Sequence, residues 1–157
     1  MGNKIKTIEE IVKISNKLRE ENKTIVTTNG SFDILHLAHV NLLEKAKKEG
    51  DVLIVLVNSD DSIKKLKGEN RPIISENERA LMLSALECVD YVVIFDEDNP
   101  LSLLEKIKPH KHVKGGSWDE ERIRAEKELL AKWNGKFKNF ELEEGYSTTN
   151  IIDKIKK

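Results

Sequence analysis

The sequence has one cysteine, few aromatic residues and no long hydrophobic run, and each absence excludes a class of protein. A single cysteine, Cys88, excludes an intramolecular disulfide framework and a cysteine-based zinc site. The longest uninterrupted apolar run, 52–57, has six residues, whereas a membrane-spanning helix needs about 20. Residues 1–22 lack the apolar core of a signal peptide. We therefore expect a cytoplasmic protein that does not bind a membrane.

Length and charge narrow the classes further. The chain has 157 residues, with 27 basic and 28 acidic side chains and a formal net charge of −1. This length suits one domain, and we expect a single domain over 1–157 with an N-terminal helix within 1–22. Because acidic and basic groups balance, binding to nucleic acid driven by bulk charge is excluded.

Short runs rich in β-branched residues predict the strands. The stronger three are 24–28, 52–57 and 91–95, and weaker ones lie at 112–114 and 137–142. The runs at 52–57 and 91–95 are apolar on both faces, which is typical of buried parallel strands.

Helical segments separate these strands. Their predicted ranges are 7–22, 37–49, 75–87, a segment beginning at Pro100, 119–133, and a last helix capped by Ser147. Strands that alternate with helices predict an α/β fold of the Rossmann-like type, a five-stranded parallel sheet with helices on both faces.

In such a sheet, ligands bind beyond the carboxyl ends of the strands. The common nucleotide loops, GxGxxG and GxxxxGK[ST], are absent. Instead, the loop after the first strand ends in His36 and His39, three residues apart where a helix begins. That spacing places both imidazoles beside free N–H groups and the positive end of the helix dipole, which favours a phosphate site. Histidines that only cap or pack are the alternative, and a zinc site would need a third ligand.

Two further loops carry groups suited to anions. Residues 59–72 form a loop with four basic side chains, which either closes over a polyphosphate or is an ordinary solvated surface. Residues 143–149 end in three hydroxyls, Ser147, Thr148 and Thr149, of which helix capping explains only the first. Arg79 lies in the first turn of its helix, against the dipole. His110 and His112 show no partner pattern, and we interpret them as structural.

Together these segments resemble the nucleotidylyltransferases with an HxGH motif, the cytidylyltransferase-like family. The matching segments are Gly30-Ser31-Phe32-Asp33-Ile34-Leu35-His36-Leu37-Ala38-His39, then Asn77-Glu78-Arg79, then Glu144-Gly145-Tyr146-Ser147-Thr148-Thr149. They occur in the family's order over about 120 residues. Within the family, Val57-Asn58-Ser59-Asp60, Leu66-Lys67-Gly68 and Val113-Lys114-Gly115-Gly116 most resemble bacterial heptose 1-phosphate adenylyltransferases.

The resemblance implies that ATP and D-glycero-D-manno-heptose 1-phosphate give ADP-heptose and pyrophosphate, a step toward lipopolysaccharide core or another heptose-bearing glycan. By matching position, His36 and His39 would hold the nucleotide phosphates, and Lys67 and Arg79 would neutralise the triphosphate. The remaining roles follow the same carry-over: Ser147, Thr148 and Thr149 with Gly30, Ser31 and Phe32 at the nucleotide, Gly115 and Gly116 against its base, and Asp33 and Asn58 at the sugar phosphate. Mg²⁺ would accompany ATP, without an assigned protein ligand.

The resemblance also implies a homodimer or a higher homo-oligomer, in the free-standing form rather than fused to a kinase. One position departs from the motif, because Ala38 stands where the family usually has glycine. A methyl group there favours the helix but would intrude on a close backbone–nucleotide contact.

Three alternatives stay open at this point. On the same fold, the substrates would be CTP with glycerol 3-phosphate, or ATP with FMN as in archaeal FAD synthetases. From a different class, the chain would be a non-catalytic module that binds a nucleotide.

Overall fold

The computed structural model describes residues 2–116, 118–141 and 144–157. Five strands form one sheet in the order β3-β2-β1-β4-β5, and every pairing in it is parallel. The strands are β1 (Ile25–Gly30), β2 (Val52–Asn58), β3 (Tyr91–Phe95), β4 (Lys111–Gly115) and β5 (Lys136–Phe140). All five predicted strands are therefore confirmed, although Leu142, which the sequence assigned to the last one, lies outside the described residues.

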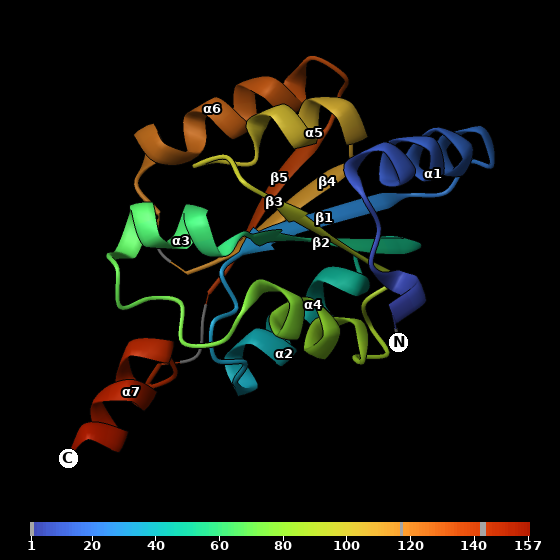
Figure 1. The fold of residues 1–157 in the computed structure, drawn as a ribbon. Coiled ribbons are helices and arrows are strands. Elements are labelled where there is room, and N and C mark those ends of the chain that lie inside the picture. Colours follow the sequence, from blue (N-terminus) through green and yellow to red (C-terminus); the bar gives the residue numbers. More distant parts are fainter. Residues whose placement is uncertain (1, 117, 142–143) are drawn as a thin grey trace.

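Helices cover both faces of the sheet (Figure 1). Helices α1, α5 and α6 lie over one face, α2 and α4 lie over the other, and α7 projects from the body near the C-terminus. The elements are η1 (Gly2–Lys4), α1 (Ile8–Glu20), α2 (Leu37–Lys47), α3 (Asp60–Lys67), α4 (Glu76–Ser84), α5 (Leu101–Ile107), α6 (Glu120–Ala131) and α7 (Thr148–Lys156). The predicted fold class is confirmed.

Two apolar clusters hold these layers together, because successive strand residues point to opposite faces. Ile25, Ile54 and Leu56 are fully buried among residues of α1 and α5. Their chain neighbours, such as Val26 and Val55, are equally buried against α2 and α4. Strands buried on both faces explain the uninterrupted apolar runs in the sequence.

Side-chain caps set three of the helix starts where the sequence predicts them. The hydroxyl of Thr7 accepts a hydrogen bond from the Glu10 N–H at 3.2 Å. Ser75 accepts from Glu78 in the same way, and both helices show the full capping box. Ser147 accepts from the Asn150 N–H at 3.0 Å and caps α7.

One prediction is wrong. The segment 59–72, expected to be a loop, contains the two-turn helix α3. Ser59 caps it by accepting from the Ser62 N–H at 3.1 Å, and its acidic first turn and basic last turn both suit the helix dipole. The run of charged residues hid this amphipathic pattern, since only Ser62 and Ile63 of the helix are buried.

The strand order places a switch point between β1 and β4. From β1, the chain moves outward through β2 and β3, and it then returns to pair β4 on the other side of β1. A crevice opens beyond the carboxyl ends of two such strands, which is where ligands bind in open α/β sheets.

No helix among the described residues is long and apolar enough to cross a membrane.

Candidate active site

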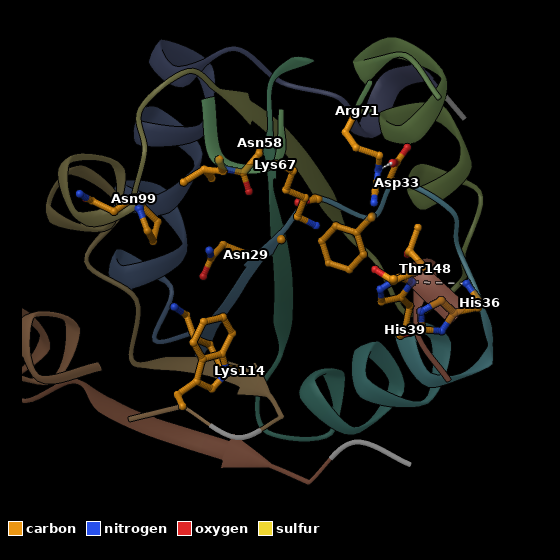
Figure 2. A pocket seen from close by; sticks show the side chains of 18 of the residues that line it. Asn29, Asp33, His36, His39, Asn58, Lys67, Arg71, Asn99, Lys114 and Thr148 are labelled. Atoms are coloured by element: carbon orange, nitrogen blue, oxygen red, sulfur yellow. Dashed lines mark hydrogen bonds and ion pairs between the residues drawn. The ribbon is translucent and has the colours of Figure 1, made fainter. Parts of the chain in front are cut away.

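A cavity of about 550 Å³ lies at this carboxyl edge of the sheet. Its volume is in the usual range for small-molecule sites. Figure 2 shows side chains from the ends of β1, β2 and β4 facing it, together with the start of α2 and of α7. Most of the site residues predicted from the sequence line it: Gly30, Ser31, Phe32, Asp33, His36, His39, Asn58, Lys67, Ser147, Thr148 and Thr149.

His36 and His39 stack on each other at the start of α2. Their ring centroids are 3.7 Å apart, and His36 occupies the N-cap position of the helix. The backbone N–H of His36 donates to Nδ1 of His39 at 3.3 Å. A neutral His39 therefore carries its proton on Nε2, which leaves an N–H donor for a ligand. Nδ1 of His36 is buried, with no hydrogen-bond partner among the described residues.

Burial keeps both imidazoles uncharged. Desolvation, which is the largest cause, and the neighbouring His36 and Lys67 together lower the pKa of His39 to about 4. Desolvation likewise lowers the pKa of His36. Near neutral pH the pair therefore offers neutral N–H donors rather than cations.

Phe32 packs against the histidine pair. Its ring meets His39 edge-on, with centroids 5.2 Å apart. Phe32 holds a left-handed φ of 48°, which is rare for a residue with a side chain. A Cβ at Gly30 would lie 3.0 Å from the Phe32 ring, so glycine there lets the ring fold back over the strand end.

The start of α7 completes this side of the cavity. Ser147, Thr148 and Thr149 line it, and the Thr148 hydroxyl donates to the Ile34 carbonyl at 3.4 Å. We call His36, His39, Ser147, Thr148 and Thr149 the histidine wall. It combines two helix N-termini, imidazole N–H groups and hydroxyls, which together suit an anion.

Lys67 and Arg71 bring the cationic groups to the cavity. Lys67 is exposed overall, but partial desolvation of its ammonium lowers its pKa, and Arg71 nearby has the same effect. Arg71 donates from Nε to Asp33 at 2.6 Å, while its Nη2 is buried with no partner among the described residues. That Nη2 group is a donor available to a ligand.

Asp33 lines the cavity, but its carboxylate is already occupied. It accepts from Arg71 and from the backbone N–H groups of Ile73 and Ile74, at 2.8 and 3.0 Å. Burial alone would raise the pKa of Asp33, but these hydrogen bonds outweigh it and lower the pKa. Asp33 therefore holds the segment before α4 in place, which differs from the expected contact with a sugar phosphate.

Arg79 is not brought to the cavity. Its side chain is fully buried, and its guanidinium donates to the carbonyls of Ile74, Ser31 and Asn58 and to the carboxylate of Asp60. These four acceptors lie just after β1, at the end of β2, at the start of α3 and just before α4. The geometry assigns Arg79 to tying these segments together, instead of the direct triphosphate contact that the sequence suggested.

Asn58 lies on the cavity floor and is also engaged. Its amide donates to the Ser62 hydroxyl at 3.0 Å, and its carbonyl accepts from Arg79 at 2.8 Å. Ser31 lines the cavity while its carbonyl accepts from Arg79 at 2.6 Å. Both residues therefore shape the floor through contacts within the protein.

On the other side of the cavity, the sequence pointed to the segment 114–118, which follows a predicted strand, but assigned no role to Lys114, Trp118 or Glu126. This side is lined by Lys114 at the end of β4, Trp118, and Glu126 of α6, and we call these three residues the lysine wall. Lys114 lies across the cavity from His36 and His39 in Figure 2. Gly115 and Gly116, expected against a nucleotide base, are not among the cavity-lining residues. Their carbonyls instead accept from Trp118 and Asn139, at 3.0 and 2.8 Å.

The two remaining histidines are structural, as the sequence indicated. His110 Nδ1 accepts from the Ile25 N–H at 2.9 Å. His112 is fully buried, and desolvation together with Lys114 lowers its pKa to about 3. Its ring lies 2.7 Å from the Thr27 hydroxyl and 3.0 Å from the Asn29 amide oxygen, so the neutral ring donates from Nε2 to Asn29.

Two observations bear on the motif and on a metal. Ala38 is 2% exposed and does not line the cavity, so its methyl group packs into the interior. Among the described residues, no group of three or more His, Cys, Asp or Glu side chains is placed to hold a metal ion.

Comparisons with known proteins identify the family of the chain. Residues 27–154 match the family model described as cytidylyltransferase-like. The bifunctional protein HldE of Geobacter metallireducens is 49% identical over 152 residues, and HldE of Campylobacter jejuni subsp. doylei is 50% identical over 153 residues. These alignments cover 97% and 98% of this chain, but only 31% and 32% of the relatives.

A solved structure shows the same fold over most of the chain. The lipopolysaccharide core biosynthesis protein of Thermoplasma volcanium superposes with a TM-score of 0.63 at 30% identity, covering 80% of this chain and 99% of that one. The family model matches well over half of the sequence and includes both histidines and the three hydroxyls of α7. The chain therefore belongs to the cytidylyltransferase-like family, and the enzyme class that this membership indicates is a nucleotidyltransferase.

Proposed function

We propose that the protein transfers AMP from ATP to D-glycero-D-manno-heptose 1-phosphate, releasing pyrophosphate. One observation carries the proposal: the stacked histidines at the start of α2 and the hydroxyls at the start of α7 line the same side of one cavity. The choice of ATP and heptose 1-phosphate rests on the resemblance described above. The HldE relatives, which this chain matches over about a third of their length, support that choice.

The chemistry requires little from the protein beyond position and charge. A phosphate monoester has a second pKa of about 6, so the acceptor is largely ionised at neutral pH and needs no general base. Its oxygen attacks the α-phosphorus in line, the bond to the bridging oxygen breaks, and pyrophosphate leaves with that electron pair. No covalent enzyme intermediate is needed.

The histidine wall would stabilise the charge that develops during this step. His39 donates from Nε2, and the hydroxyls of Thr148 and Thr149 lie beside the first free amides of α7. Arg71, whose buried Nη2 has no hydrogen-bond partner among the described residues, and Lys67 would neutralise the β- and γ-phosphates. Fixed donors of this kind favour the transition state because they need no reorganisation as charge moves.

Mg²⁺ fits this donor set as a companion of the triphosphate. Asp33 already accepts three hydrogen bonds, so the oxygens around the ion would come from the phosphates and water. The ion would supply Lewis-acid neutralisation of the phosphate oxygens. Arg79 is proposed to act at a distance, by holding the segments that carry Ser31 and Asn58.

The test is pyrophosphate release with Mg²⁺, with ATP and CTP each offered with heptose 1-phosphate and with glycerol 3-phosphate. Release only with ATP and heptose 1-phosphate is the expected result. Release with CTP and glycerol 3-phosphate would be consistent with the proposed role of the histidine wall and would refute the proposed choice of substrates. With no release from any pair, FMN with ATP would be assayed next. If no pyrophosphate is released there either, the result would favour a non-catalytic module that binds a nucleotide.

A further inference from the structure

Phe32 lies between the apolar core and the histidine wall. It is 5% exposed and belongs to the same buried cluster as Leu43 and Val57, yet it also lines the cavity. Its ring meets the His39 ring at 62°, with centroids 5.2 Å apart. The proposed mechanism uses His39 as a donor and gives the Phe32 side chain no role. Through Phe32, however, the interior of the protein is in direct contact with that imidazole.

The backbone of Phe32 is held in a conformation that its side chain disfavours. Its φ of 48° lies in the left-handed region, which costs free energy in a residue with a bulky side chain. Such a conformation persists only where the surrounding contacts fix it. The flanking residues supply those contacts, because the Ser31 carbonyl accepts from Arg79 at 2.6 Å and the Asp33 carboxylate accepts three hydrogen bonds. The strained turn is therefore fixed on both sides.

Gly30 leaves room for the Phe32 ring. A Cβ at Gly30 would lie 3.0 Å from Cε2 and 3.3 Å from Cζ of Phe32, so the ring would have to move. The φ of Gly30 lies outside the left-handed region, and its backbone would therefore accept alanine. The missing side chain at Gly30 thus serves the position of the ring rather than the path of the backbone.

The imidazole of His39 is fixed by contacts from two parts of the chain. Its Nδ1 accepts from the His36 N–H at 3.3 Å, and its face stacks on the His36 ring. Both of these contacts come from the same helix start and move with it. Phe32 belongs instead to the segment between β1 and α2, so its ring ties the imidazole to the end of the sheet.

An apolar ring against an imidazole has two physical consequences. It restricts the rotation of the His39 side chain, and a fixed donor must be held within about 0.5 Å of its working position. It also keeps water from one side of the imidazole, and desolvation is the largest cause of the lowered pKa of His39. The titratable groups that act on His39, namely His36 on α2 and Lys67 at the end of α3, favour the neutral form as well. The start of α7 contributes hydroxyls, which carry no charge.

We propose that Phe32 is a positioning residue for His39: its ring holds the imidazole so that Nε2–H points into the cavity, and Gly30 provides the space that this ring needs. This inference rests on the proposed function, because it takes His39 as the donor to the reacting phosphates. The state of the imidazole can nevertheless be measured without any substrate.

Two measurements on the same variants separate a positioning role from a structural one. NMR of the histidine ring nitrogens reports the tautomer and the titration of His39 in the free protein. Steady-state pyrophosphate release reports kcat and the KM for ATP. The variants are Phe32→Leu, which removes the ring, Gly30→Ala, which keeps the ring but crowds it, and the two combined. The matched control is Phe95→Leu, because Phe95 is 1% exposed in the other apolar cluster and does not line the cavity.

In Phe32→Leu, water gains access to the imidazole, so the titration midpoint of His39 should rise from about 4 toward the ordinary 6.5, by about one pH unit or more. The kcat should fall about tenfold with the KM for ATP kept within about threefold, since a displacement of about 1 Å can cost about 10²-fold in rate. Gly30→Ala should change both readouts in the same direction and by less. Phe95→Leu should destabilise the protein to urea as Phe32→Leu does, and leave both readouts near their wild-type values.

The combined variant tests the role of Gly30. If Gly30 acts through the ring, Gly30→Ala should add no further loss once the ring is removed, because changes that act through one contact are not additive. Losses that multiply would mean that a side chain at Gly30 meets the substrate directly, and would overturn the role assigned to this glycine.

An unchanged tautomer and midpoint of His39 in Phe32→Leu, or changes no larger than those in Phe95→Leu, would overturn the positioning role. If Phe32→Leu does not fold, Gly30→Ala decides the question alone by the same midpoint. A wild-type protein that releases no pyrophosphate would refute the proposed reaction, and the NMR measurements would still decide whether Phe32 positions His39.

Discussion

The two walls of the cavity hold their polar groups in opposite ways. The histidine wall is built from helix N-termini, and its donors are available: His39 keeps Nε2–H, and Arg71 beside it has a buried Nη2 with no partner among the described residues. On the lysine wall, the ammonium of Lys114 is matched by Glu126 at 2.6 Å. The difference teaches that one cavity can keep hydrogen-bond donors available on one side while a charge on the other side is already neutralised within the protein.

The largest expected effect is on the histidine wall. His39→Ala removes a fixed donor beside the reacting phosphates, so we expect kcat to fall by about 10²–10³, the loss typical of one such donor. Steady-state pyrophosphate release measures it. His39→Gln, which keeps an N–H in the region of Nε2, should recover part of the rate. Near-normal turnover of the alanine variant would contradict the role of this wall.

Next in size is a stability effect beneath the cavity. Arg79→Met leaves three carbonyls and the partly exposed Asp60 carboxylate without their donor. We expect a loss of about 3 kcal/mol in the free energy of unfolding, because one buried polar group left unsatisfied typically costs about 1–3 kcal/mol. Urea unfolding measures the loss. Met82, half exposed on the same helix, gives the control Met82→Ala, which should change the free energy of unfolding far less. An Arg79 variant as stable as that control would show that the guanidinium does not hold these segments.

A smaller effect is expected at Arg71. Arg71→Met removes the buried Nη2 donor, and we expect kcat/KM for ATP to fall about 10–100-fold, as for one or two charge-assisted hydrogen bonds. Lys64→Met on the exposed face of α3 is the matched control, since Lys64 does not line the cavity. Equal losses in both variants would point to overall charge rather than to this donor.

The smallest effect concerns pH. The folded-state pKa of His39, about 4, is below its ordinary 6.5, so the unfolded chain takes up this proton first as the pH falls. Stability is therefore present above about pH 6.5 and is lost progressively toward pH 4. His39→Gln should reduce that slope by up to one proton in urea-unfolding measurements across this window. An unchanged slope would mean that His39 is not held neutral.

The sequence revealed the histidine wall because its residues are neighbours in the chain. His36 and His39 lie one helical turn apart, and Ser147, Thr148 and Thr149 are consecutive, so spacing indicated each group separately. The resemblance to the family placed the two groups in one site. The strands of the sheet could also be predicted from the sequence, because β2 and β3 are apolar on both faces. Those features depend on local periodicity, which a single sequence records.

The lysine wall could not be read in this way, because tertiary contacts create it. Lys114 and Glu126 meet only when α6 packs behind β4, and nothing in their spacing distinguishes them from surface charges such as Lys138 and Glu49. Arg79 and Asp33 occupy motif positions, from which contacts with the substrates were predicted. Both side chains are buried, however, and they bond to other groups of the protein. Helix α3 was missed because its charged residues outnumber the two that it buries.

One set of kinetic measurements tests the division between the walls most directly. Steady-state pyrophosphate release from ATP and heptose 1-phosphate is compared for His39→Ala and for Lys114→Met with Glu126→Gln. The account predicts that kcat falls by orders of magnitude in the first variant. In the second, it predicts that kcat is largely kept, because the Lys114 charge is already neutralised by Glu126. Loss of the same kinetic parameter in both variants, or near-normal kcat without His39, would contradict it.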